Sequence, residues 1–249
     1  MNKIYVLTLF PEAVMGVLGD SIIGNAIKNK IVSIECVQIR DYTVNKQMQV
    51  DDYPYGGGMG MLLMADPLYR AWKSVADRCK APHTILMSAQ GARYGQHTAR
   101  RLSLEEELIF VCGHYEGVDQ RFIDECVDEE ISIGDFVLTG GEIPALAVID
   151  SVCRLLPGVL ADESCYIDES HWAGTLEYPQ YTRPEVWHDK KVPEVLLSGH
   201  HENIRKWRRA KSLRITKERR PDLFAKLELS KEDRKLLADA EKEGKAENE

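Results

Sequence analysis

Three glycine-bearing segments of this chain have the composition of ligand-binding loops. They read SAQG at residues 88–91, CGHYEG at 112–117 and SIGDFVLTGGE at 132–142. Glycine lets a ligand approach the backbone closely, so that main-chain N–H and C=O groups can bind a flat heterocycle such as adenine. One such segment alone is more often an ordinary tight turn, whereas three together favour a binding site.

A second group of candidates lies on a predicted helix that is otherwise apolar, from Glu142 to Leu156. Asp150, Ser151 and Arg154 share one face of it, because residues three and four apart are neighbours on a helix. A guanidinium there could stabilise negative charge on a substrate. It could equally complement the helix dipole in the last turn. The residues alone leave both interpretations open.

A third group is a dense run of cations near the C-terminal end. Between residues 205 and 220 the only acid is Glu218, although the net charge of the whole chain is −8. Such an asymmetry is the electrostatic footprint of a local nucleic-acid contact, and its density favours phosphate binding over a merely solvated face. Trp207 could stack on a base, although a tryptophan among basic helices more often packs in a core. The cations are Arg205, Lys206, Arg208, Arg209, Lys211, Arg214, Lys217, Arg219 and Arg220.

The elements that must position these residues alternate in type. Buried strands separated by helices predict an α/β layer with a largely parallel sheet, in which ligands bind beyond the carboxyl ends of the strands. The segment 193–237 is helical in character, with stops at Gly199 and Pro221, and the charged tail from Ala238 is expected to fray. Predicted strands are 4–10, 31–40, 84–88 and 108–112, and predicted helices are 67–79, 95–104 and 142–156.

The composition excludes several classes of protein. The length of 249 residues and the 44% hydrophobic content suit one large domain, or a medium domain with a smaller partner. The chain has neither the phosphate-binding G-x-x-x-x-G-K-[ST] motif nor a G-x-G-x-x-G dinucleotide fingerprint. Six cysteines without zinc-ligand spacing predict reduced structural thiols and no metal site. No apolar run is long enough to span a bilayer or to act as a secretory signal, so we expect a cytoplasmic protein.

The motifs together are similar to those of one family. PYGGG at 54–58, VCGHYEG at 111–117, SIGDFVL at 132–138, GGE at 140–142 and YTRPE at 181–185 resemble, in order and spacing, the bacterial tRNA (guanine-N1)-methyltransferases of the SPOUT class. The likeness covers nearly the whole chain. It implies a parallel-sheet domain with a deep trefoil knot and a small C-terminal helical domain. The expected parts are a cofactor domain at 1–160, a flexible linker at 161–174 and a helical tRNA-binding domain at 175–249.

The resemblance also implies a co-substrate, S-adenosylmethionine, and the residues that bind it. A Mg²⁺ requirement stays open. Phe136 stands where the family usually has tyrosine, so any contact through that hydroxyl is lost. Carried over by position, the expected cofactor-binding residues are Ser88, Gly113, Tyr115, Glu116, Ile133, Gly134, Asp135, Phe136, Val137, Leu138, Gly140, Gly141 and Pro144.

The reaction that the resemblance implies needs a base and a cation. Guanine N1 is a poor nucleophile until its proton leaves, and negative charge then builds on O6. By position Arg154 is the cation. The family's base is normally an aspartate, but here Glu169 occupies that position and Asp168 is the alternate; separate substitutions would decide between them. The family further implies a homodimer with the active site at the subunit interface, and binding of a tRNA anticodon stem-loop, for which the expected residues are Arg183, Arg205, Arg208, Arg209 and Lys211.

Two rival functions remain at this point. The chain could methylate a ribose 2′-OH as another SPOUT-class enzyme does, or it could be a non-catalytic RNA-binding protein with a disabled cofactor fold. The departure at Glu169 leaves room for the second rival, while Arg154 and the three intact loops weigh against it.

Overall fold

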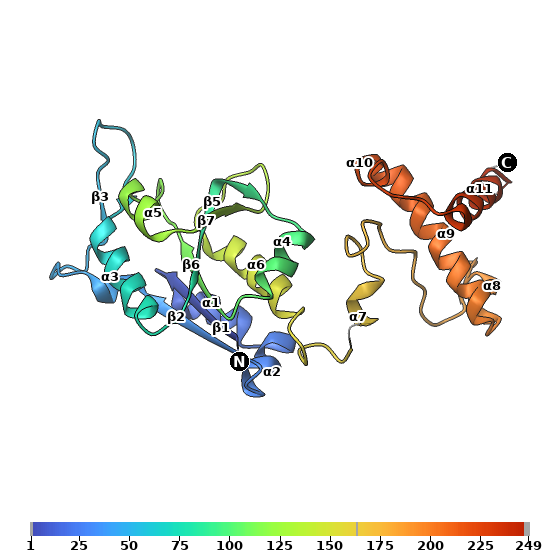
Figure 1. The fold of residues 1–249 in the computed structure, drawn as a ribbon, viewed down its shortest axis with the longest axis horizontal. Helices are drawn as coiled ribbons and strands as arrows, with labels where there is room; N and C mark the ends of the chain where they lie inside the picture. Colours follow the sequence, from blue (N-terminus) through green and yellow to red (C-terminus); the bar gives the residue numbers. More distant parts are fainter. Residues whose placement is uncertain (1, 163, 247–249) are drawn as a thin grey trace. The chain divides into compact units, whose positions relative to one another are not determined.

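The structure is a computed structural model that describes residues 2–162 and 164–246. Its contacts separate the chain into two compact units, Met1–Ala161 and Asp162–Glu249. Figure 1 shows the elements of both. Within the described ranges, no helix combines the length and the apolar character needed to cross a bilayer.

The first unit is built on a parallel sheet. In its described residues five strands are ordered β2-β1-β6-β5-β7, and every neighbouring pair is parallel. The predicted parallel α/β sheet is therefore confirmed. All residues of β6 are buried, as expected of a strand covered on both faces. The strands are β1 (Asn2–Thr8), β2 (Val32–Gln38), β5 (His83–Arg93), β6 (Glu107–Cys112) and β7 (Glu129–Ser132).

Helices cover both faces of this sheet. Alternate residues of a strand point to opposite faces, and Leu7 and Val111 join the core cluster that contains Leu68 of α3 and Phe122 of α5. On the other face α6 packs against β6, α1 and α4. The helices are α1 (Pro11–Leu18), α2 (Ser21–Lys28), α3 (Ala65–Ala76), α4 (Gln96–Leu102), α5 (Gln120–Cys126) and α6 (Glu142–Cys153).

The sequence pattern predicted no helix at α1, α2 or α5 and no strand at β7. The acidic residues around β7 conceal it, since Glu129 and Glu130 do not read as an apolar strand. The long segment after β2 is less irregular than expected. A 3₁₀ turn, η1 (Ile39–Tyr42), ends the predicted strand early, and β3 (Asp51–Asp52) pairs antiparallel with β4 (Leu62–Leu63).

The second unit is mainly helical in its described residues. The predicted stops are confirmed, because Gly199 adopts a φ of +69° between two helices and Pro221 begins the next one. The expectation of a frayed tail from Ala238 is wrong as far as Ala246, since a helix continues to that residue; residues 247–249 lie outside the described chain. The elements are α7 (Ser164–Ile167), β8 (Val186–Trp187), β9 (Lys190–Lys191), α8 (Glu194–Leu197), α9 (His201–Arg219), α10 (Pro221–Phe224) and α11 (Lys231–Ala246).

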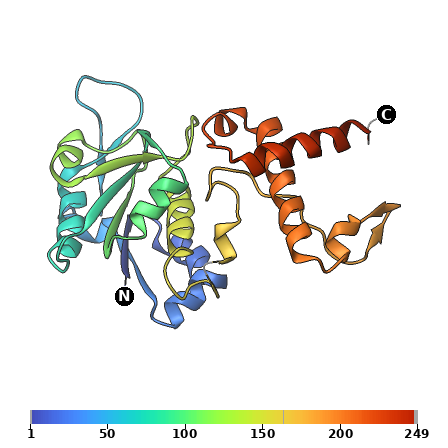
Figure 2. The same ribbon diagram turned by 45° about the vertical axis from the view of Figure 1, so that its right-hand side comes forward.

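The long helix α9 is the centre of the second unit (Figure 2). Helix α11 packs against it, and Leu213 of α9 is fully buried. The segment that precedes the β8–β9 hairpin is fixed to α9 by side-chain hydrogen bonds. Thr216 Oγ1 accepts from the Leu176 N–H at 2.8 Å, and Ser212 Oγ donates to the Leu176 carbonyl at 2.6 Å.

Candidate functional site

A cavity of about 270 Å³ opens at the carboxyl ends of β6, β5 and β7, which are neighbours in the sheet. This is the place where open α/β sheets bind ligands. All the residues expected to bind the cofactor line the cavity except Asp135, whose side chain is exposed. The lining members of that set are Ser88, Gly113, Tyr115, Glu116, Ile133, Gly134, Phe136, Val137, Leu138, Gly140, Gly141 and Pro144.

The first of the three loops is not the end of a strand. Strand β5 continues through it to Arg93, and both Met87 and Ala92 pair with Ile131 of β7. Residues 88–91 therefore bulge out of the ladder beside the cavity. A Cβ on Gly91 would lie 2.4 Å from the Glu130 carbonyl carbon, so the close approach of β7 requires glycine there.

The second and third loops are joined by their backbones. The Gly141 N–H donates to the Gly113 carbonyl at 2.7 Å, and His114 forms an antiparallel bridge with Gly140. A Cβ on Gly141 would lie 2.7 Å from the Cα of Cys112 and 2.9 Å from the Gly113 nitrogen. Backbone atoms cannot rotate away as a side chain can. Gly140 and Gly141 thus let the chain return to the end of β6 before α6 begins.

The glycine-rich segment 54–60 leads into the wall of the same cavity. The Glu116 N–H donates to the Met61 carbonyl at 3.0 Å, and the Leu63 N–H donates to the Gly117 carbonyl at 2.9 Å. Gly60, at a φ of +87°, lies directly against the Glu116 side chain. Sequence reasoning did not include Leu62 or Val118 in the site, because only these cross-chain bonds bring them to it.

The charged groups of the cavity are acidic. Among the described residues that line it, Glu116 and Glu130 are the acids, His114 and Tyr115 are also titratable, and there is no lysine or arginine. His114 Nδ1 is buried without a hydrogen-bond partner, so it is available to a ligand. A cavity without cations does not suit a phosphate-bearing nucleotide, whereas carboxylates favour a ligand with positive charge. The main-chain donors and acceptors of the glycine loops suit the heterocycle of such a ligand.

The three residues of the predicted polar stripe on α6 differ in their surroundings. Ser151 Oγ lies 2.7 Å from the Tyr94 hydroxyl and also donates to carbonyls one turn back in the helix. Asp150 is exposed. Arg154 caps the end of α6 and is half-buried.

The two candidate bases belong to the second unit, in the turn after α7. Glu169 is half-buried, and its main chain accepts from the Trp172 N–H and donates to the Tyr166 carbonyl. The rings of Tyr166 and Trp172 pack at a centroid distance of 4.5 Å around this turn. Asp168 is exposed. The segment expected as a linker therefore contains local structure that its composition did not indicate.

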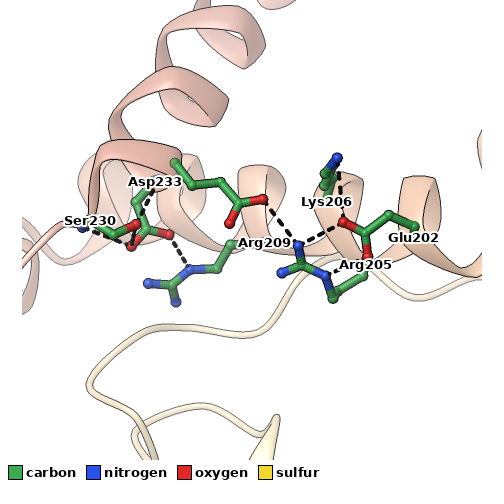
Figure 3. Close-up of polar contacts among 7 residues, drawn as sticks. Glu202, Arg205, Lys206, Arg209, Ser230 and Asp233 are labelled. Atoms are coloured by element: carbon green, nitrogen blue, oxygen red, sulfur yellow. Dashed lines mark hydrogen bonds and ion pairs between the residues drawn. The ribbon is translucent and has the colours of Figure 1, made fainter.

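Acids from outside the basic run neutralise much of it (Figure 3). Arg205 is ion-paired with Glu202 and Glu232, and Arg209 Nε lies 2.7 Å from Asp233 Oδ1. The Arg209 guanidinium lowers the pKa of Asp233 to about 2. Arg214 and Arg220 pair in the same way with Glu218 and Asp222. The sequence interval contained one acid, but the fold supplies several more, from α10, from α11 and from the first turn of α9.

Two of the other expected RNA-binding residues, Arg208 and Lys211, lie near aromatic rings. Within the described chain, no ion pair forms at Arg183, Arg208 or Lys211. The Arg208 guanidinium lies 4.8 Å from the centre of the Tyr178 ring, and Lys211 Nζ lies 5.9 Å from that of Trp207. These cations remain available for phosphate.

The cysteines are free thiols, most of them in or beside the core. Burial raises the pKa of Cys153 to about 12 and that of Cys36 and Cys126 to about 11. Thiols with raised pKa values are poor nucleophiles. In the described residues, no three His, Cys, Asp or Glu side chains gather as a metal site.

The sheet and its acidic, glycine-lined cavity define an α/β protein whose candidate ligand site lies beside the carboxyl ends of its strands. The sequence identifies the family. Residues 2–226 match the family described as "tRNA (Guanine-1)-methyltransferase TrmD", and the chain belongs to it.

Curated relatives can be aligned with this chain along almost their entire length. The chain is 59% identical over 235 residues to a tRNA (guanine-N(1)-)-methyltransferase of Clostridium perfringens, covering 94% of this chain and 98% of the relative. It is 56% identical over 226 residues to one of Ruminiclostridium cellulolyticum (90% and 97% covered) and 55% identical over 240 residues to one of Clostridium botulinum (96% and 99% covered).

Proposed function

We propose that this protein methylates N1 of the guanine just 3′ of the anticodon in tRNA, with S-adenosylmethionine as the methyl donor. Its family and its relatives are tRNA (guanine-N1)-methyltransferases. The observation that carries the proposal is the cavity, because a glycine-lined pocket with carboxylates and no described cation suits a sulfonium ligand.

The cavity residues fit the methyl donor in two ways. The adenine would lie against the main chain of Gly113 and of 133–138, whose close approach depends on the glycines. Glu116 and Glu130 would balance its positive charge. S-adenosylmethionine supplies a methyl group that its sulfonium already activates, so the protein has to bind, align and deprotonate the acceptor.

The acceptor chemistry is assigned to Arg154 and Glu169, with Asp168 as the alternate base. A carboxylate takes the N1 proton of guanine and leaves negative charge on O6. Arg154 stabilises that charge. The family resemblance assigns this role to Arg154, which is half-buried at the end of α6.

The protein acts as a homodimer in this proposal, and the segment 161–174 of one subunit completes the site of the other. Exposed apolar side chains beside the cavity support a subunit interface. Phe10 is 46% exposed and packs edge-on against the His114 ring, and Ile143 is 59% exposed beside the cavity residue Pro144. Val17 of α1, a helix that packs on α6, is also exposed. A monomer at working concentration in sedimentation would contradict the dimer.

Three finer features complete the proposal. The first domain, 1–160, forms a trefoil knot, which is supported by the return of the 133–141 segment to the end of β6. Residues 161–174 link it to a helical tRNA-binding domain at 175–249, which contacts the anticodon stem-loop through Arg183, Arg208 and Lys211 in particular. The site of action is the cytoplasm, where tRNA is modified.

The test is methylation of an unmodified tRNA transcript, followed by nucleoside analysis. We expect 1-methylguanosine at the position 3′ of the anticodon. A 2′-O-methyl product would assign the protein to the ribose-methylating class instead. Intact tRNA binding without cofactor binding in calorimetry would favour a non-catalytic RNA-binding protein.

Separate Glu169→Gln and Asp168→Asn variants identify the base. Removing the base should lower kcat by about a hundredfold or more, since general-base catalysis contributes that much. The other variant should keep activity within a few-fold. Equal, small effects in both would remove the carboxylate from the mechanism.

A further inference from the structure

A second hollow lies wholly within the second unit, and no assigned role accounts for it. It has a volume of about 600 Å³ and is lined by the segment 178–183, by α8 and by the first half of α9. We call it the aromatic groove. Its aromatic side chains are Tyr178, Tyr181 and Trp207, and its cations are Arg183 and Arg208.

One ring of the groove, that of Tyr181, is well exposed, whereas Tyr178 and Trp207 are half-buried. Tyr181 is 49% exposed, and its ring centroid lies 6.4 Å from that of Trp207 at an interplanar angle of 53°. A flat base can stack on such rings irrespective of its identity. The hydrogen-bonding groups of Glu185, which also lines the groove, can accept from the amino group of a base.

The charge of the groove identifies the kind of ligand. Arg205 and Arg209 on the same helix are engaged by acids of α9 and α11, but Arg208 forms no ion pair in the described chain. Its guanidinium is held 4.8 Å from the Tyr178 ring, which fixes its plane at the groove while leaving its N–H groups available. Aromatic faces next to an unneutralised guanidinium match a base and its phosphate.

We propose that the aromatic groove binds one unpaired nucleotide of the tRNA, with the base against Tyr181 and Trp207 and the phosphate on Arg208 and Arg183. This rests on the proposed function, since it takes tRNA as the substrate. Within the basic run, the arginines paired with acids then stabilise the helical unit, whereas Arg208 binds RNA at the groove.

The test compares two exposed aromatic residues of the same unit in the full-length protein. Tyr181→Ala should raise the Kd for tRNA about tenfold, because the loss expected when base stacking on an aromatic side chain is removed is of that order. Tyr181→Phe should retain the affinity, since it keeps the ring. Trp187→Ala is the matched control: Trp187 is 61% exposed and lies on the hairpin outside the groove, so its loss should leave Kd unchanged.

A second pair of variants tests the phosphate contact. Arg208→Gln should weaken binding at low salt and reduce the dependence of log Kd on log salt by about 0.7, which is one phosphate contact to a single strand. Arg219→Gln is the control, because Arg219 is exposed on the same helix but does not line the groove. For Tyr181→Ala and Arg208→Gln, we expect the affinity for S-adenosylmethionine to stay as in the wild type, because neither residue lines the cavity of the first unit.

The outcomes separate this inference from the proposed function. If wild-type protein neither binds nor methylates tRNA, the proposed function fails. If it does both and Tyr181→Ala behaves as Trp187→Ala does, the groove proposal alone is wrong. A Tyr181→Ala variant that changes the oligomeric state in sedimentation but not the Kd for tRNA would show that the groove binds a second copy of the chain, which also overturns the proposal.

Discussion

The cavity of the first unit depends mainly on backbone atoms, whereas the basic helix of the second unit depends on side chains. The cavity is formed largely by main chain: a bulge within β5 and the glycine loops that follow β6 and β7, which are joined by the bond from Gly141 N–H to the Gly113 carbonyl. The basic helix depends on side chains whose availability is set by distant partners, such as Asp233 for Arg209. Local sequence therefore describes the cavity well, and describes the charged surface poorly.

The largest effect, on the affinity for S-adenosylmethionine, is expected from replacing Gly141, which contacts the backbone at the end of β6. Gly141→Ala places a Cβ within 3 Å of backbone atoms of residues 112 and 113, so the loops must separate. We expect binding of S-adenosylmethionine to fall below detection in calorimetry. Gly16→Ala is the control, because a Cβ there meets nothing within 4 Å and alanine favours the helix α1. Wild-type cofactor affinity in Gly141→Ala would disprove a backbone-built site.

Arg154→Ala sharpens the comparison, since Arg154 is the residue of the first unit whose proposed role in catalysis depends on its side chain. Loss of a cation that stabilises developing charge should lower kcat by about a hundredfold or more. The affinity for S-adenosylmethionine should stay nearly constant, because Arg154 does not line the cavity. Steady-state kinetics with calorimetry separate the two quantities. Unchanged turnover would remove Arg154 from the mechanism.

The smallest of these effects concerns the ion pair between α9 and α11. The pKa of Asp233 is lowered from 3.8 to about 2 by Arg209, so its contribution to stability is complete above about pH 4 and is lost as the pH falls towards 2. Asp233→Asn should lower the free energy of unfolding by on the order of 1 kcal/mol at neutral pH and flatten its decline below pH 4.

Urea unfolding of the full-length protein at several pH values measures this effect. Asp222→Asn is the control, because Asp222 and Arg220 form an exposed pair near the helix ends, where solvent screens the interaction. If both variants lose the same stability, the Arg209–Asp233 pair has no special role in holding α11 against α9.

The sequence alone determined the sheet, the loops that line the cavity and the family. Its buried strands and the positions of glycine follow from local backbone requirements, which residue type records directly. It did not predict β7 or the continuation of β5 through residues 88–93. Glu129 and Glu130 do not read as a strand, and the bulge in β5 interrupts its pattern, so both are strands only because they pair with each other.

Only the tertiary structure decided which cations of α9 remain available. Arg205 and Arg208 are equivalent in type and stand one turn apart, yet Glu202 and Glu232 neutralise the first while the second lies over Tyr178 in the aromatic groove. Electrostatic partners are chosen by distance in space, and residues 205 and 232 become neighbours only when α11 packs against α9.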